Sequence, residues 1–179
     1  GAEGPTSPMM KHAPMNTIVS IGAAALSTLY MQVLAGGITI YAYHVAISPI
    51  TIDDPVGAMA MVLLAWFTGV AVGLCFMAAK PWVPDLIGLV VLIYQRMNMI
   101  ASGKMFVANM TPGYILAYFD WNPLFHAIDQ ARGYVFLNYS PHFSSWHYAL
   151  SVGVVLLMVG LMGEFYTRKH ASASWYAKR

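Results

Sequence analysis

Residues 53–80 read DDPVGAMAMVLLAWFTGVAVGLCFMAAK, and this stretch decides the fold class. After the acidic pair at its start, no charged residue occurs until Lys80. A helix needs roughly 20 mainly apolar residues to cross the hydrocarbon core of a bilayer, and this stretch is long enough. Asp54 and Pro55 are typical of a helix start, because a carboxylate can cap free backbone N–H groups and proline fits the first turn. We therefore expect a membrane-spanning helix over residues 57–79.

The same apolar pattern recurs on both sides of this stretch. We expect further spans over residues 17–44, 83–104 and 147–166. Of all 179 residues, 59% are hydrophobic and only 9% are charged, which excludes a water-soluble globule. Two short, aromatic-rich helices, external or re-entrant, are expected before the last span, over residues 114–119 and 123–137. The sequence thus predicts an all-α integral membrane protein of four transmembrane helices, forming a single membrane domain over residues 1–179.

The few charges predict an orientation, since short cytoplasmic loops accumulate Lys and Arg. The basic residues expected on one side are Lys11, Lys80, Arg168, Lys169, Lys178 and Arg179. The loop with Asp53 and Asp54 falls on the other side. We therefore expect both termini in the cytoplasm, a cytoplasmic segment over residues 1–16 and an external, gate-like segment over residues 105–146. The net charge of +2 is too small to suggest a nucleic-acid partner.

The most informative local pattern is WNPLFHAIDQAR, residues 121–132. Asn122 can cap a helix whose first residue is Pro123. Roughly along one face of that helix follow His126, Asp129 and Arg132. One interpretation is a polar stripe on an external gate or substrate path. The other is an ordinary helix start with local ion pairing, and the spacing leaves both open.

Arg96 lies past the middle of the third expected span, where a charge costs a few kcal/mol. Such a residue normally faces a protein interior or a wet cavity, which makes it a candidate for lining a channel. The alternative is that its long side chain reaches the external interface together with Lys104.

Four histidines fall near the expected external side, namely His44, His126, His142 and His147. No pair has the tight helical spacing of a strong metal signature, so we expect neither a metal nor another cofactor. A metal- or pigment-binding membrane protein, with His147 as the candidate ligand of a tetrapyrrole, is the competing interpretation.

The pattern at residues 121–132, and the order of segments around it, resemble the membrane subunit of ABC-2 type transporters that export capsular polysaccharide or O-antigen. That family shows an aromatic residue, Asn-Pro-Leu, a His, an acidic residue and an Arg, all with counterparts here. Residues 166–169 also resemble the family's C-terminus, and residues 9–18 resemble the segment before its third span. The resemblance covers essentially the whole chain. The family's N-terminal interface helix and first two spans have no counterpart.

This resemblance implies a permease subunit in the bacterial inner membrane that exports polysaccharide or a lipid-linked glycan. The chain has no phosphate-binding loop, so it is not expected to be an enzyme, and ATP hydrolysis would need a separate ABC ATPase subunit. The family pairs two permeases with two ATPases, which implies a homodimer or a larger complex. The segment that would contact the ATPase contains Met9, Met10, Lys11, His12 and Pro14. The alternative is a truncated or repurposed paralogue that serves as a structural subunit of a larger membrane complex.

Overall fold

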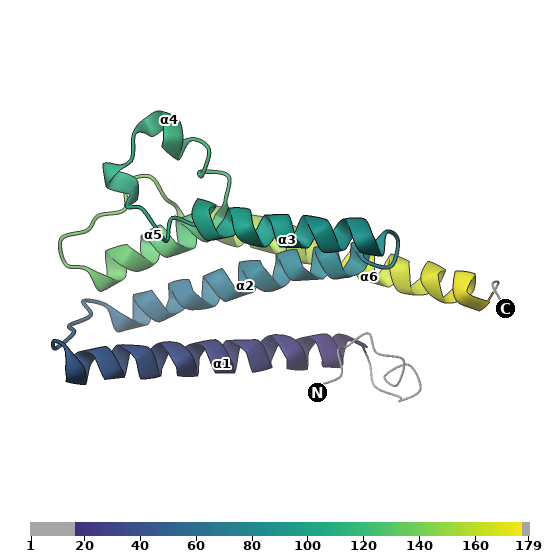
Figure 1. The fold of residues 1–179 in the computed structure, drawn as a ribbon, viewed down its shortest axis with the longest axis horizontal. Helices are drawn as coiled ribbons and strands as arrows, with labels where there is room; N and C mark the ends of the chain where they lie inside the picture. Colours follow the sequence, from purple (N-terminus) through teal and green to yellow (C-terminus); the bar gives the residue numbers. More distant parts are fainter. Residues whose placement is uncertain (1–16, 177–179) are drawn as a thin grey trace. The chain divides into compact units, whose positions relative to one another are not determined.

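The structure, a computed structural model, describes residues 17–176, and every element in that range is helical (Figure 1). The elements are α1 (Thr17–Ala46), α2 (Pro55–Ala79), α3 (Pro84–Ala101), the 3-10 turn η2 (Ala108–Met110), α4 (Gly113–Leu116), α5 (Pro123–Val135) and α6 (Trp146–Tyr176). Three helices are long and apolar enough to cross a membrane, over Val19–Ala46, Pro55–Ala79 and Trp146–Thr167. The expected all-helical membrane protein is thereby confirmed, whereas a fourth span, at α3, stays a prediction.

The chain divides into two compact units, of which the first contains α1 and the second contains α2 to α6. In α1, the hydroxyls of Thr28 and Thr39 donate to carbonyl oxygens one turn earlier, at 2.7 and 2.8 Å, so both are satisfied inside an apolar helix. After the helix ends, the backbone N–H of Ile50 donates to His44 Nδ1 at 2.9 Å. His44 therefore closes the turn that follows α1. Asn16, an expected cap of this helix, lies outside the described residues.

The start of α2 has the cap that the sequence predicts. Asp54 Oδ1 accepts the backbone N–H groups of Val56 and Gly57, each at 3.0 Å, and Pro55 is the first helical residue. The Asp54 N–H donates to the carbonyl of Tyr134 in α5 at 2.9 Å. The beginning of α2 is therefore joined to the end of α5.

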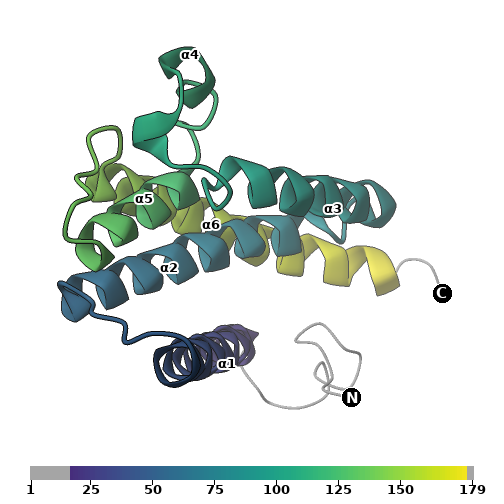
Figure 2. The same cartoon turned by 60° about the vertical axis from the view of Figure 1, so that its left-hand side comes forward.

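Within the second unit, α2 and α6 run side by side and parallel (Figure 2). A Cβ at Gly153, early in α6, would lie 2.8 Å from a ring carbon of Phe67, and one at Gly160 would lie 2.9 Å from Leu74 Cβ. The second contact lies seven residues further along both helices than the first, so the two helices are parallel. At Gly160 the backbone of α2 itself approaches closely, at Cys75 N and Leu74 C, as is common between helices in membranes, whereas Gly153 makes room for the side chains of Phe67 and Thr68.

The C-terminal end of α2 is also joined to α6. Thr167 Oγ1 donates to the Ala78 carbonyl at 2.9 Å and accepts the indole N–H of Trp82 at 2.9 Å. One turn before the end of α2, the Cys75 thiol donates to the Leu156 carbonyl at 3.2 Å. Together with the glycine contacts, these bonds fix the parallel register along the C-terminal half of α2.

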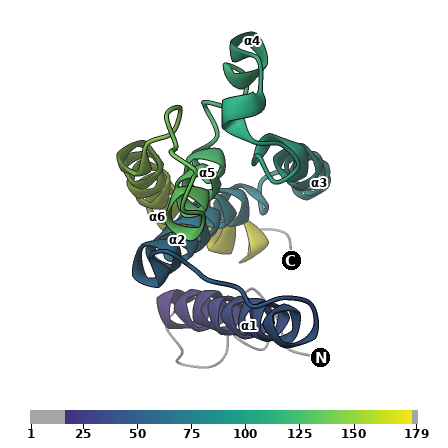
Figure 3. The same ribbon diagram turned by 90° about the vertical axis from the view of Figure 1, so that its left-hand side faces the viewer.

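Helix α3 returns in the opposite direction (Figures 1 and 2). It begins just after the end of α2, and its Tyr94 ring meets Phe76 edge-on at a centroid distance of 5.4 Å. At its far end Asn98 accepts a hydrogen bond from Asn122, which precedes α5. None of the 18 residues of α3 is buried. Figure 3 shows α4 standing away from α2 and α6, and Figure 1 shows it at the same end of the unit as α5.

Candidate functional site

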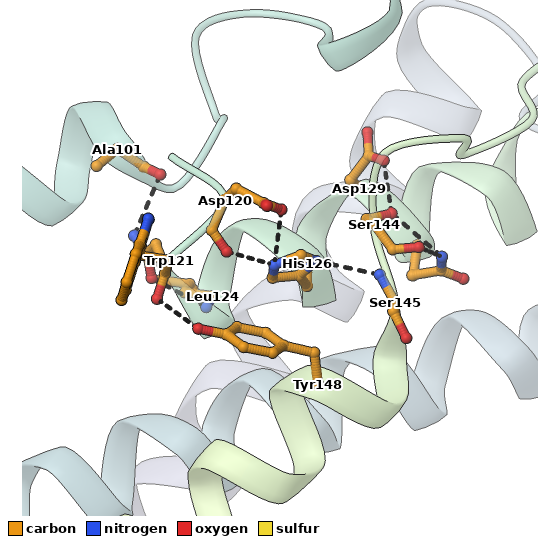
Figure 4. A network of polar contacts seen from close by, with 11 residues as sticks. Ala101, Asp120, Trp121, Leu124, His126, Asp129, Ser144, Ser145 and Tyr148 are labelled. Carbon is orange, nitrogen blue, oxygen red and sulfur yellow. Dashed lines mark hydrogen bonds and ion pairs between the residues drawn. The ribbon is translucent and has the colours of Figure 1, made fainter. Parts of the chain in front are cut away.

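The residues singled out at 122–132 lie on α5 or at its start, and we call them and their partners the α5 cluster. Figure 4 shows two of them, His126 and Asp129, with their bonding partners. Asn122 caps α5, because its side-chain oxygen accepts the Leu124 N–H at 3.0 Å and Pro123 is the first helical residue, as the sequence predicts. Its amide nitrogen donates to Asn98 Oδ1 at 2.6 Å and to the Ala101 carbonyl at 3.1 Å. Asn122 therefore joins the end of α3 to the start of α5.

His126 is buried, with 4% of its surface exposed. Its Nδ1 accepts the backbone N–H of Ser145 at 3.1 Å, and since a backbone N–H can only donate, the proton of the neutral ring is assigned to Nε2. Nε2 donates to the Asp120 carbonyl at 2.7 Å and lies 3.4 Å from the carboxylate of the same residue. The ring also packs against Tyr148 at a centroid distance of 4.7 Å. His126 thus joins the segment before α5 to the start of α6.

Asp129 is fully buried. Tyr139 donates its hydroxyl to Oδ1, and Ser144 donates to Oδ2 at 2.7 Å. The Gln130 amide then donates to the carbonyl and the hydroxyl of Ser144, at 2.8 and 3.1 Å. Both oxygens of a buried carboxylate are therefore satisfied by side chains of the loop between α5 and α6, as a buried charge requires.

The contact with Asp129 changes the acidity of Tyr139. Burial, followed by the hydrogen bond to Asp129 and its negative charge, raises the pKa of Tyr139 from 10.0 to about 12, although Arg132 acts in the opposite direction. Tyr139 therefore keeps its proton, and so stays a donor to Asp129, at any physiological pH.

Arg132 is directed toward the segment that follows α3. Its guanidinium donates to the carbonyls of Phe106 at 2.8 Å and Gly103 at 2.6 Å. Gly103 has a φ of +75°, a backbone conformation that favours glycine, and it packs against Phe125. Arg132 thus holds a turn whose carbonyls converge on one cation.

The α5 cluster combines one local ion-pair contact, between His126 and Asp120, with hydrogen bonds to other segments. The partners of His126 and Asp129 lie before α5 or in the loop that leads to α6, and those of Arg132 follow α3. Among the described residues no ion pair joins Asp129 to Arg132, and their hydrogen bonds go to other partners. A role in a gate or substrate path stays a prediction. The geometry shows that hydrogen bonds join α3, α5 and the start of α6 at one end of the unit.

Arg96 does not join this cluster. Its side chain is exposed on α3, and no hydrogen bond or ion pair connects it to another described residue. A hollow of about 330 Å³ lies nearby on α3, but Arg96 is not among its lining residues. Both expectations for Arg96, a channel wall or a side chain reaching the interface, stay predictions.

Sequence reasoning missed three residues of the cluster, Tyr139, Ser144 and Gln130. A weak signal was present, since a buried Asp needs donors and the 138–145 loop is rich in hydroxyls. The candidate ATPase-contact residues Met9, Met10, Lys11, His12 and Pro14 lie outside the described residues. Among the residues that the structure describes, no group of three or more His, Cys, Asp or Glu side chains is placed to hold a metal ion.

Comparison with known protein families finds no family model that matches this chain, and comparison with curated proteins finds no relative.

Proposed function

We propose that the chain is the membrane permease subunit of an ABC transporter that exports polysaccharide or a lipid-linked glycan. The observation that carries the proposal is the α5 cluster. Asn122, Pro123, His126, Asp129 and Arg132, on which the resemblance rests, lie in one block built around α5, whose four polar side chains bond to segments before and after the helix. The block joins α3, α5 and α6 at one end of two apolar helices, which suits a part that moves as a unit at the mouth of a passage.

Four spans are part of this proposal, and the parallel packing of α2 with α6 supports the fourth. Two parallel spans cross the bilayer in the same direction, so the chain between them must cross back once. In the described residues between α2 and α6, α3 has 18 residues and α5 has 13. At 1.5 Å per residue, α3 is about 27 Å long, which is close to the thickness of the hydrocarbon core, whereas α5 is much too short.

In the proposed orientation the chain lies in a bacterial inner membrane with both termini on the cytoplasmic side. Lys80 follows α2 directly, and its neighbour Trp82 bonds to Thr167, so the basic residues at 80 and 168–169 belong to one end of the α2–α6 pair. Asp54 and the α5 cluster belong to the opposite end. This separation follows the rule that Lys and Arg gather on the cytoplasmic side.

A glycan substrate is supported by the aromatic side chains around α4. Tyr114, Tyr118 and Trp121 are 73, 82 and 82% exposed. Sugar rings stack on aromatic faces, and such residues also suit the membrane interface. Because they lie near the α5 cluster, they would line the proposed external mouth.

Co-purification tests the function. A tagged chain recovered from native membranes is expected to bring down an ABC ATPase. The variant Lys11→Glu, in the segment that resembles the ATPase contact, is expected to lose that ATPase, whereas the control Lys178→Glu, on the same expected side of the membrane, is expected to retain it.

The second candidate is a structural subunit of a larger membrane complex, and one observation favours it. The buried side chains of His126 and Asp129 are bonded within the chain, so neither presents a polar atom to a passage here. Stable recovery with an unrelated membrane complex and without any ATPase would establish this alternative and refute the permease.

A further inference from the structure

The hollow of about 330 Å³ at the end of α3, which we call the α3 hollow, is rich in hydrogen-bond donors. Its lining residues are Tyr94, Gln95, Asn98, Met99, Lys104 and Leu124. Four of these six side chains end in a donor group, namely a phenol, two amides and an ammonium group. None of the described residues that line the hollow is acidic. The lining therefore favours an anion over a cation.

The hydrogen bonds of Asn122 define the orientation of the Asn98 amide. The Leu124 backbone N–H can only donate, so the Asn122 atom that accepts it at 3.0 Å is the side-chain oxygen. The other end of the Asn122 amide is then the nitrogen, which donates to Asn98 at 2.6 Å, so the Asn98 atom in that contact is an oxygen. No hydrogen bond joins the remaining Asn98 nitrogen to another described residue. This nitrogen is therefore a donor available to a ligand in the α3 hollow.

Two cations lie at the α3 hollow, and no ion pair joins either of them to another described residue. Lys104 lines the hollow and is exposed. Arg132 approaches from α5, and its guanidinium lies 3.5 Å from the Lys104 carbonyl oxygen. The acidic residue of α5, Asp129, is bonded instead by hydroxyls of the loop that leads to α6. Positive charge therefore predominates at the hollow.

The α3 hollow lies at the level where α6 begins. Tyr148, in the first turn of α6, donates its hydroxyl to the Trp121 carbonyl at 3.3 Å, and the next residue, Asn122, bonds to Asn98. Helix α6 is long and apolar enough to cross a membrane, over Trp146–Thr167. The start of such a helix lies near the boundary between hydrocarbon and headgroups, where lipid phosphates are found.

We propose that the α3 hollow binds the phosphate group of an anionic phospholipid such as phosphatidylglycerol. The ammonium group of Lys104 pairs with the phosphate, and the amide nitrogens of Asn98 and Gln95 donate to its oxygens. Hydrogen bonds to a charged acceptor are about twice as strong as those between neutral groups. Basic pockets beside membrane helices are known to hold anionic lipid headgroups.

The rest of the lining favours a lipid over a free phosphate ion. Met99 and Leu124 are apolar, and Tyr94 adds an aromatic ring. A free ion gains nothing from such surface, whereas the glycerol and first acyl carbons of a lipid bury apolar area against it. The inference goes beyond the proposed function, because it requires only that the α2–α6 pair lies in a membrane and not that the chain transports a substrate.

Native mass spectrometry of the full chain in detergent tests the site, with palmitoyl-oleoyl-phosphatidylglycerol as the probe. We expect the wild type to bind this lipid in preference to palmitoyl-oleoyl-phosphatidylcholine, whose choline cancels the phosphate charge. Lys104→Gln is expected to weaken the binding about tenfold, since it removes a charge-assisted hydrogen bond. The matched control Arg96→Gln removes the same charge outside the hollow and is expected to bind as the wild type does. Equal losses in the two variants, or equal binding of the two lipids, would overturn the proposal.

Two nearly isosteric variants test the amides. Asn98→Asp keeps the oxygen that accepts Asn122 and replaces the nitrogen by a second oxygen, which repels phosphate. Gln95→Glu makes the same change at an exposed position, where no hydrogen bond joins the amide to another described residue. Each variant is expected to weaken phosphatidylglycerol binding about tenfold or more, and thermal unfolding is measured alongside. Unchanged binding in Gln95→Glu, with a melting temperature like that of the wild type, would refute the amide contacts whatever Asn98→Asp does.

Inorganic phosphate distinguishes the lipid from the free ion. At millimolar concentration it is expected to leave phosphatidylglycerol bound. Displacement of the lipid would show that the α3 hollow takes the free ion and would overturn the lipid assignment. Neither result bears on ATPase co-purification, so the site and the proposed function can fail independently.

Discussion

Two regions that share α6 are held together in different ways. Along the α2–α6 pair, the contacts are mainly between apolar side chains and glycine backbone, as at Gly160 against Leu74. In the α5 cluster, the contacts are hydrogen bonds to buried polar side chains such as His126 and Asp129. Inside a bilayer, apolar surface gives helices little tendency to associate, because lipid tails are equally apolar. Close packing at glycine therefore has to stabilise the α2–α6 pair. In the α5 cluster, the hydrogen bonds of His126 and Asp129 hold α5 against the segment that leads to α6.

The largest effect is expected from breaking the close approach. Gly160→Leu places a Cβ 2.9 Å from Leu74 Cβ and 3.1 Å from the backbone nitrogen of Cys75, which cannot move aside as a flexible side chain does. We expect a loss of about 3 kcal/mol and a clearly lower thermal unfolding temperature in detergent. Gly69→Leu is the control, because its Cβ meets nothing within 4 Å. Equal melting of both variants would contradict the role of glycine in the pair.

The next largest effect tests the cluster. Asp129→Ala leaves the hydroxyls of Tyr139 and Ser144 without their acceptor in a buried site, and we expect a loss of about 2 kcal/mol. Circular dichroism melting measures it. Asp120→Ala is the comparison, since the Asp120 side chain is 61% exposed and the bond from His126 reaches its backbone carbonyl. A melt of Asp129→Ala that matches Asp120→Ala would show that the buried carboxylate does not stabilise the loop.

A smaller, pH-dependent effect is expected at Tyr139. Its pKa is about 12 in the folded chain against an ordinary 10.0, so the folded state holds the proton to higher pH. The stabilisation is therefore complete below pH 10 and is lost as the pH rises through 12. Tyr139→Phe is expected to cost about 1 kcal/mol at neutral pH and to flatten this dependence. A wild-type melting temperature that falls no more steeply than that of Tyr139→Phe between pH 10 and 12 would contradict it.

The smallest effect is expected at Ser102, which is fully buried and whose Oγ has no hydrogen-bond partner among the described residues. Ser102→Ala removes an unsatisfied hydroxyl, so the melting temperature is expected to stay equal or to rise slightly. Thr167→Val, which removes a hydroxyl bonded to both Ala78 and Trp82, is expected to lower it. A clear loss of stability in Ser102→Ala would show that its hydroxyl is satisfied after all.

Local features of the fold were predictable from the sequence because they depend on near neighbours in the chain. The Asp54-Pro55 and Asn122-Pro123 helix starts are confirmed, since a cap needs only the two or three residues that follow it. Apolar length likewise predicts α1, α2 and α6 as helices able to cross a membrane. The α5 cluster was predictable only in part. His126, Asp129 and Arg132 were singled out by spacing, but their partners in the 103–106 and 138–145 segments come from other parts of the chain.

By itself, the sequence determined that this is a helical membrane protein, which residues cap α2 and α5 and where its few charges fall, because hydrophobic length and capping are local properties. Only the tertiary structure decided that α2 and α6 pack against each other and that the polar stripe of α5 is satisfied by loops on either side. Those features depend on the close packing at Gly153 and Gly160 and on hydrogen bonds between residues distant in sequence. No periodicity along the chain encodes which distant donor meets which acceptor.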